Sequence, residues 1–249
     1  MARLLIFRGI THEGRQLPPP QTFFVKEDKD FTCQHGTIAK EELTKPDGST
    51  IKSNTGKAFV LLTPNFGDLH ARLKKAPQTI PHKDIGRILV QTGITKESIV
   101  VDAGLGSGAL AIQLANTCKE VIAYEKEEAT ISVAKDNLEF CGTKNITIKH
   151  KDIYDGIDET NVDVITLDLP EPWKVVEHAA KALKHGGWLV AYNPTIGQIA
   201  KFNDALGEEF MHEKNLEIIE RAWDAHGLIL RPKKTPIGHS GFLSFARKV

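Results

Sequence analysis

From residue 82 onward, short apolar runs alternate with longer segments in which apolar residues recur every three to four positions. The apolar runs are typical of buried strands and span residues 98–103, 121–124, 146–149, 162–167 and 188–192. The longer segments have the spacing of amphipathic helices and span residues 82–92, 109–116, 127–140, 173–183 and 196–206. This alternation predicts an α/β fold in which helices cover both faces of a parallel sheet.

The end of the chain breaks this alternation. Two more strand-like runs, residues 216–223 and 241–247, have no helical pattern between them, so we expect an antiparallel pair at the sheet edge. With the five parallel strands, this pair makes a sheet of seven. Gly186 and Gly187 follow the helix predicted for residues 173–183 and stand where a C-cap glycine is expected.

The first part of the chain has β character instead. Strand-like runs at residues 3–10, 22–25 and 57–62 are separated by proline- and glycine-containing turns. We therefore predict three regions, namely a small β domain (1–65), a connecting segment (66–81) and the α/β domain (82–249).

Composition and charge exclude several classes of protein. The 249 residues are 41% hydrophobic and 26% charged, which is typical of a globular protein, and no apolar run is long enough to span a bilayer. The apolar start of the chain is too short for a signal peptide, so we expect a cytoplasmic protein. The cysteines at 33, 118 and 141 have no metal-ligand spacing, so we expect no metal site. A formal net charge of zero leaves only local basic patches for contact with nucleic acid.

A glycine-rich turn follows the first strand of the α/β region. Residues 99–108 read Ile-Val-Val-Asp-Ala-Gly-Leu-Gly-Ser-Gly, and a helix is predicted to begin directly afterwards. Glycines let the backbone turn sharply near a ligand, and helix N–H groups favour a polar or anionic one. The next strand ends at Glu125, roughly twenty residues on, where a nucleoside ribose needs an acceptor. The pattern predicts a nucleoside-containing cofactor, although a strand–turn–helix with incidental glycines would look the same.

The details of the turn favour S-adenosylmethionine (SAM) over a dinucleotide. Ala109 stands where the dinucleotide pattern G-x-G-x-x-G has its last glycine. Asp102, just before the turn, would repel a pyrophosphate but would attract the ammonium group of a methionine moiety.

A second carboxylate is expected at the same edge of the sheet. Asp168 directly follows the strand at 162–167, and ligands of such sheets bind at the carboxyl ends of the strands. Pro170 and Pro172 stiffen the loop that presents it. Such a loop, with Trp173 at its end, suits a planar acceptor such as a nucleobase. Alternatively, Asp168 only ends the strand and Trp173 packs in the core.

These segments resemble one enzyme family. Asp168-Leu169-Pro170-x-Pro172, together with Val101-x-Ala103-Gly104-x-Gly106-Ser107-Gly108, is similar to the tRNA (adenine-N1) methyltransferases of the TrmI family, most of all its archaeal branch. Further similar segments are Pro77-Gln78, Lys83-Asp84, residues 151–157, residues 177–183, Arg231-Pro232, residues 239–242 and residues 245–247.

The resemblance implies a Rossmann-like SAM-dependent methyltransferase fold. It implies methyl transfer from SAM to N1 of a T-loop adenine of tRNA, at position 58 and in some archaeal members also at 57. Family members are typically homotetramers, so we expect a homo-oligomer with no membrane partner. Two other readings stay open: another SAM-dependent methyltransferase that acts on a small molecule or a protein, and a non-catalytic tRNA-binding subunit.

The resemblance also assigns roles to individual residues. Asp168 would be the catalytic carboxylate. The cofactor would be bound by Gly104, Leu105, Gly106, Ser107, Gly108, Glu125, Asp152 and Gln78. The acceptor adenine would be flanked by Trp173, Tyr192 and His82. This chain departs from the family at Pro81-His82, where the order of the two residues is inverted, and at Ser240, where threonine is common.

Overall fold

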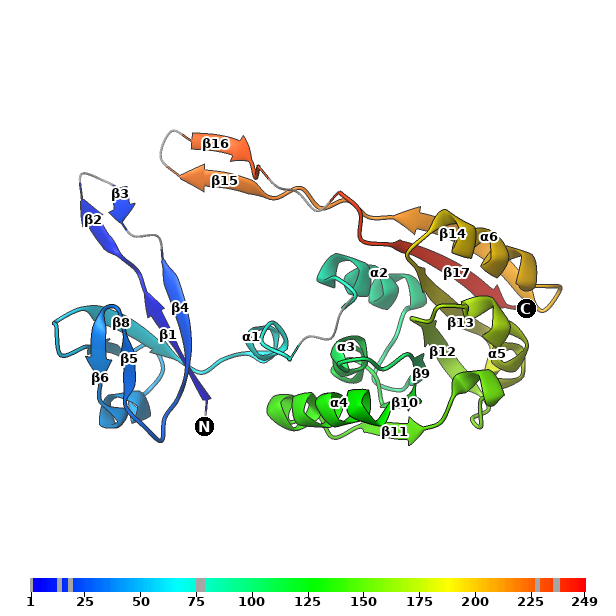
Figure 1. Ribbon diagram of the computed structural model, residues 1–249, viewed down its shortest axis with the longest axis horizontal. Coiled ribbons are helices and arrows are strands. Elements are labelled where there is room, and N and C mark those ends of the chain that lie inside the picture. Colours follow the sequence, from blue (N-terminus) through cyan, green and yellow to red (C-terminus); the bar gives the residue numbers. More distant parts are fainter. Residues whose placement is uncertain (1, 13–14, 18–19, 75–78, 227–228, 235–237) are drawn as a thin grey trace. The chain divides into compact units, whose positions relative to one another are not determined.

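The computed structural model describes residues 2–12, 15–17, 20–74, 79–226, 229–234 and 238–249. The chain divides into two compact units, one built mainly on residues 1–71 and the other on residues 72–225 and 229–249 (Figure 1). Each unit has its own hydrophobic core.

The N-terminal unit is a small antiparallel β structure. Its sheet has the order β4 (Gln21–Lys26), β1 (Ala2–Phe7), β8 (Ala58–Leu62) and β7 (Thr50–Lys52). The remaining elements are β2 (Ile10–His12), β3 (Arg15–Leu17), β5 (Phe31–Cys33), β6 (Gly36–Ile38), η1 (Lys40–Thr44) and α1 (Phe66–His70). The core is aromatic and aliphatic, with Leu5, Phe59 and Leu61 almost fully buried. The predicted β character of this part of the chain is confirmed.

The C-terminal unit contains the predicted seven-stranded sheet. The strands lie in the order β11 (Ile146–His150), β10 (Glu120–Glu125), β9 (Ile99–Ala103), β12 (Val162–Leu167), β13 (Leu183–Asn193), β17 (Phe242–Lys248) and β14 (Phe210–Glu217). The first five are parallel, and β17 runs antiparallel to both of its neighbours. The α/β class and the antiparallel edge pair are thus confirmed.

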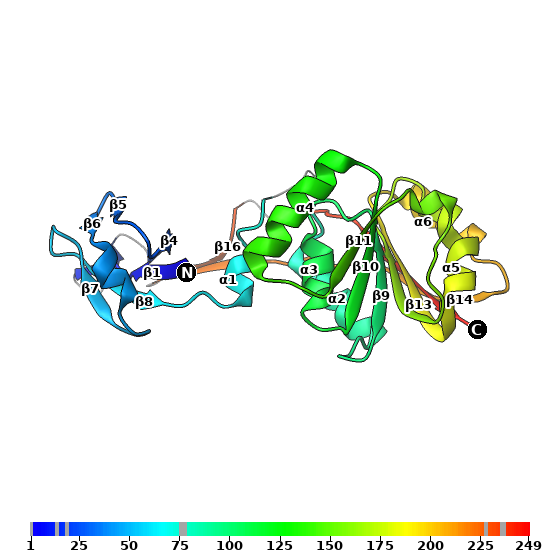
Figure 2. The same ribbon diagram turned by 90° about the horizontal axis from the view of Figure 1, so that it is seen from below.

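Helices cover both faces of this sheet. Those on one face are α2 (His82–Thr92), α3 (Ala109–Ala115) and α4 (Glu128–Cys141), and those on the other are α5 (Val176–Ala182) and α6 (Ile196–Ala205) (Figure 2). The central strands are apolar on both sides because each face is buried: Val100 packs with the first group of helices and Val101 with the second.

One predicted helix end was wrong. Gly186 and Gly187 do not cap a helix, because α5 already ends at Ala182 and β13 begins at the next residue. The two glycines lie in an irregularity of β13, where its pairing with β12 shifts register. Gly186 has a φ of 79°, and a Cβ on Gly187 would lie 2.9 Å from the carbonyl oxygen of Lys184. The glycines therefore permit a bulge in a strand.

The strand predicted at residues 216–223 was also misplaced. The observed β14 covers Phe210–Glu217, and a separate hairpin of β15 (Trp223–His226) and β16 (Ile229–Pro232) follows. β14 consists mostly of charged and polar residues because it is an edge strand, and its apolar residues are Phe210, Met211 and Leu216. Its apolar signal was therefore too weak to mark where the strand begins.

The three cysteines are free. In the described ranges, no cluster of three or more His, Cys, Asp or Glu side chains could hold a metal ion. Among the described helices, none has the length and apolar character needed to cross a membrane.

Candidate functional site

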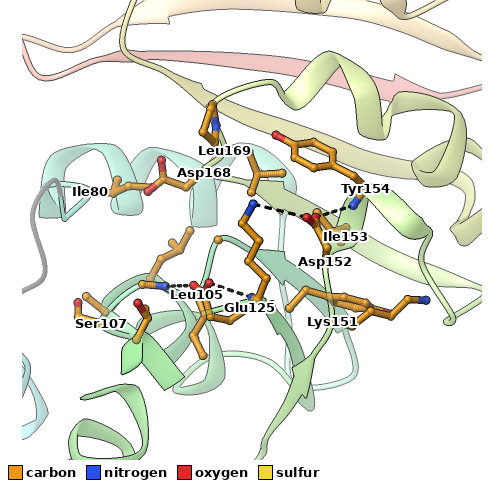
Figure 3. Close-up of a pocket in the computed structure, with 18 of the residues that line it drawn as sticks. Ile80, Leu105, Ser107, Glu125, Lys151, Asp152, Ile153, Tyr154, Asp168 and Leu169 are labelled. Carbon is orange, nitrogen blue, oxygen red and sulfur yellow. Dashed lines mark hydrogen bonds and ion pairs between the residues drawn. The ribbon is translucent and has the colours of Figure 1, made fainter. Parts of the chain in front are cut away.

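A cavity of about 550 Å³ lies in the C-terminal unit, at the carboxyl ends of the parallel strands (Figure 3). This volume is in the range of small-molecule sites, which is about 300–1,000 Å³. Its wall includes Gly104, Leu105, Gly106, Ser107, Glu125, Asp152 and Asp168. These predicted residues lie at or just after the ends of four different strands, and all of them line the same cavity, as expected at the carboxyl edge of a parallel sheet.

The three glycines of the turn have positive φ angles and three different surroundings. A Cβ on Gly104 would lie 2.2 Å from the carbonyl oxygen of Asp168, so this glycine lets the two loops touch. A Cβ on Gly106 would have its nearest neighbour at 3.8 Å and would occupy the cavity. Gly108 does not line the cavity. It precedes α3, and a Cβ at this position would lie 3.3 Å from Cδ1 of Leu138 in α4.

Glu125 fastens the glycine turn to the end of β10. Its Oε2 accepts a hydrogen bond from the Gly106 N–H at 3.2 Å, and its Oε1 accepts from the N–H groups of Lys126 and Glu127. A carboxylate has about four acceptor positions, so capacity remains for a ligand hydroxyl. Glu125 faces the cavity in Figure 3, as its predicted role requires.

Asp152 is on the wall of the same cavity, after β11. It caps the short 3-10 turn η2 (Ile153–Asp155), accepting a hydrogen bond from the Tyr154 N–H at 3.1 Å. Its other oxygen is 3.5 Å from Nζ of Lys126. Both contacts hold the carboxylate in place without enclosing it.

Asp168 is the first residue after β12, and its N–H donates to the carbonyl oxygen of Ala103 at 2.9 Å. Burial raises the pKa of its carboxyl group to about 7. The loop behind it is held from two sides, because Gln198 donates to the Pro170 carbonyl at 3.1 Å and the Tyr154 hydroxyl accepts from the Glu171 N–H at 3.1 Å. The loop is therefore fixed by side chains from outside it as well as by its prolines.

Asp102 is not on the cavity wall, contrary to the role suggested by its place before the turn. It is 1% exposed, and its Oδ1 accepts a hydrogen bond from the Thr166 hydroxyl of the neighbouring strand at 2.6 Å. Burial, with a smaller effect from the charges of Asp168 and Glu125, raises its pKa to about 7. Its carboxyl group is buried against the neighbouring strand, away from the cavity wall.

The residues predicted to flank an acceptor base also lie off the cavity wall. His82 is the exposed first residue of α2, and Trp173 lies in the 3-10 turn η3 (Pro172–Val175) with Nζ of Lys201 4.8 Å from its ring centre. Tyr192 is buried at the end of β13. Gln78 falls outside the residues that the structure describes.

The structure adds residues that the sequence analysis missed. Lys126, Lys151 and Tyr154 line the cavity. The places of Lys126 and Lys151 directly after β10 and β11 could have revealed these two, whereas Tyr154 lies further on, in η2. Asn137 had no such signal. This buried residue of α4 donates to the carbonyl oxygens of Ser107, at 2.8 Å, and Lys74, at 3.0 Å. It thereby fixes the glycine turn from the helix behind it.

The donors and acceptors of this site fit SAM. The glycine turn leaves open space beside Gly106, where a ligand can lie. The carboxylates of Glu125, Asp152 and Asp168 line the same cavity. Such a wall suits a molecule that carries ribose hydroxyls, an amino-substituted base and positive charge.

Comparison with known proteins agrees with this chemistry. The family model described as "tRNA methyltransferase complex GCD14 subunit" matches residues 58–231. A tRNA (adenine(57)-N(1)/adenine(58)-N(1))-methyltransferase TrmI from Methanocaldococcus jannaschii is 38% identical over 253 residues, covering 89% of each chain. The crystal structure of a SAM-dependent O-methyltransferase from Thermotoga maritima has a TM-score of 0.86 at 30% identity and covers 100% of this chain and 92% of its own. The tRNA (m1A58) methyltransferase TrmI from Aquifex aeolicus shares the fold, with a TM-score of 0.82 at 24% identity and coverage of 100% and 97%.

Proposed function

The chain belongs to the family of the tRNA methyltransferase complex GCD14 subunit, and from this premise we propose that it methylates N1 of an adenine in the T-loop of tRNA. The methyl donor is SAM. The names of its relatives place the target at adenine 58, and the archaeal one adds adenine 57. One observation supports this function above the others: Asp168 stands on a fixed loop at the wall of the cavity that the glycine turn and Glu125 also line.

We expect different residues of the cavity wall to contact different parts of the cofactor. Glu125 would accept hydrogen bonds from the ribose hydroxyls, Asp152 would bind the amino group of the adenine, and residues 104–107 would border the methionine part. When bound, SAM supplies a methyl group activated by a positively charged sulfur.

Asp168 would act on the acceptor base. N1 of neutral adenine already has a lone pair, so no proton must leave before the methyl group is attacked. After attack, the ring carries positive charge. A carboxylate that accepts a hydrogen bond from the N6 amino group stabilises this charge and can take up a proton afterwards. Since N1 lies on the Watson–Crick edge, the base must leave its stack to reach the site.

The pKa of Asp168 predicts how activity depends on pH. Because burial raises this pKa to about 7, the carboxylate form is lost as the pH falls below that value. We expect kcat/KM to decrease about tenfold per pH unit in this acidic range and to level off above it. A pH profile of methyl transfer, measured with wild type and with Asp168→Asn, tests this. A wild-type profile that is flat between pH 5.5 and 8.5 would contradict it.

The deciding experiment for the function is methyl transfer from labelled SAM to an unmodified tRNA transcript. We expect N1-methyladenosine that maps to the T-loop, and no product with a transcript in which the T-loop adenines are replaced by guanine. Failure to label tRNA, with SAM binding intact, would refute the proposed substrate. Small-molecule hydroxyl acceptors would then be tested, as the name of the Thermotoga maritima relative indicates.

We also propose that copies of this chain assemble. Large apolar side chains are exposed on and just before the β15–β16 hairpin, with 69% of Ile219, 53% of Trp223 and 74% of Leu230 accessible. Large apolar side chains that are exposed in one part of the chain are candidates for burial at an interface. Light scattering should give a mass that is a multiple of 27.5 kDa, with four copies expected from the family resemblance, and Trp223→Asp should lower it. A wild-type monomer that needs a different chain for activity would contradict self-assembly.

A further inference from the structure

A buried ion pair lies in the first turn of α2, away from the cavity wall. Asp84 is 1% exposed, and Nζ of Lys83 donates to both of its carboxylate oxygens, at 2.9 and 2.8 Å. Buried ion pairs add little net stability, because removing two charges from water costs about as much as their attraction returns. The function of this pair is therefore better judged from the residues that it connects than from its contribution to stability.

Ser240 joins the pair to the C-terminal part of the chain. Its hydroxyl accepts a hydrogen bond from Nζ of Lys83 at 2.7 Å and donates one to Oδ2 of Asp84 at 3.1 Å. The three side chains thus form a closed set of hydrogen bonds. This network ties the beginning of α2 to the residues that lead into β17.

The backbone of the same segment holds Tyr192. The Tyr192 hydroxyl donates to the Ser240 carbonyl oxygen at 2.5 Å. Gly241 lies against the ring, because a Cβ at this position would be 2.4 Å from Cζ of Tyr192. Only glycine at position 241 lets the backbone pass this close to the tyrosine ring. A shift of residues 240 and 241 would therefore move the ring of Tyr192 as well.

The strand register places Tyr192 next to Asp168. β12 and β13 are parallel, Leu167 pairs with Ala191, and the two residues that follow these partners are Asp168 and Tyr192. Burial raises the pKa of Tyr192, and the charges of Asp84 and Asp168 add to this effect. The network therefore acts on the tyrosine that borders the catalytic loop.

We propose that Lys83, Asp84 and Ser240 are positioning residues that set Tyr192 beside Asp168, and thereby fix where the acceptor base lies during methyl transfer. The proposal rests on the proposed function. Since none of the three lines the cavity as described, they should affect the rate of transfer and not the affinity for SAM.

The test compares Ser240→Ala with Ser240→Thr. The alanine variant loses the bridging hydroxyl, and we expect kcat for tRNA methylation to fall at least about tenfold, since small displacements of reacting groups are costly. The dissociation constant for SAM should not change. Threonine keeps a hydroxyl at this position and should restore most of the rate.

Asp84→Asn provides a stronger second variant, and Asp136→Asn is its matched control. Asp136 is paired with Lys74 at 2.6 Å, but both side chains are more than half exposed. We expect Asp84→Asn to lower kcat and the control to keep the wild-type rate. Thermal unfolding of all variants shows which of them fold.

A second readout reports on Tyr192 without tRNA. The chain has three tyrosines, so fluorotyrosine labelling gives three fluorine signals, and Tyr192→Phe identifies the one of interest. Ser240→Ala should shift the Tyr192 signal and leave the signals of Tyr124 and Tyr154 in place. An unmoved Tyr192 signal, a wild-type rate in Ser240→Ala, or an equal loss of SAM affinity would each overturn the proposal. If wild type fails to methylate tRNA, the proposed function fails, and the fluorine signal still decides whether the network sets Tyr192.

Discussion

Replacing Asp168 by alanine or asparagine should lower methyl transfer to tRNA by about 10²- to 10³-fold, the usual cost of losing one preorganised electrostatic group. The dissociation constant for SAM should stay close to that of wild type, because we propose that the glycine turn and Glu125, which line the cavity, make the methionine and ribose contacts. Transfer rates under single-turnover conditions and SAM titrations by calorimetry separate the two effects. Asp204→Asn, an exposed change on α6, is the matched control.

The pKa of Asp168 also predicts what this replacement does to stability. Its value of about 7 in the folded chain is above the ordinary value of 3.8, so the folded state binds the proton more tightly. Proton binding by Asp168 therefore contributes to the free energy of unfolding. This contribution is fully present below pH 3.8 and is lost as the pH rises through about 7. At pH 8, Asp168→Asn should therefore unfold at the wild-type temperature or above it. A clear loss of SAM binding or of stability would make Asp168 a cofactor ligand or a folding residue.

Gly106→Val should abolish SAM binding, and with it methyl transfer. Gly106 has a φ of +55°, which a β-branched residue avoids, and a side chain here would enter the cavity. The same change would strain the backbone whose N–H donates to Glu125. Equilibrium dialysis with labelled SAM measures the effect directly.

The control for this prediction is Gly86→Val. Gly86 lies on the exposed face of α2, and a Cβ there would meet no atom within 4 Å. This variant should bind SAM as wild type does. Normal SAM affinity in Gly106→Val would show that the cofactor binds elsewhere, whereas weak binding in both variants would point to a general loss of folding.

The sequence alone determined the class of fold and the centre of the site. Strands buried on both faces are apolar at nearly every position, so β9 and β12 were visible as short apolar runs. Side chains at the ends of such strands meet at one sheet edge, which is why the sequence placed Glu125 and Asp168 together, and the family resemblance added Asp152.

The apolar run that marks a buried strand was weaker where one face of the strand is exposed. The mostly polar sequence of β14 hid the start of that strand. The glycines of β13 were interpreted as a helix end because a bulge and a C-cap favour the same residue. The first error comes from a weak apolar pattern, and the second comes from a local pattern that fits two backbone geometries.

Only the tertiary structure decided which polar groups meet across long distances in the chain. Asn137 reaches the glycine turn 30 residues earlier, and Ser240 reaches Asp84 across 156 residues. It also showed that the Asp102 side chain is buried against Thr166 of the neighbouring strand, although its place in the sequence resembles that of a ligand-facing residue. The physical reason is that periodicity fixes the face on which a side chain lies, whereas its partners depend on how the elements pack.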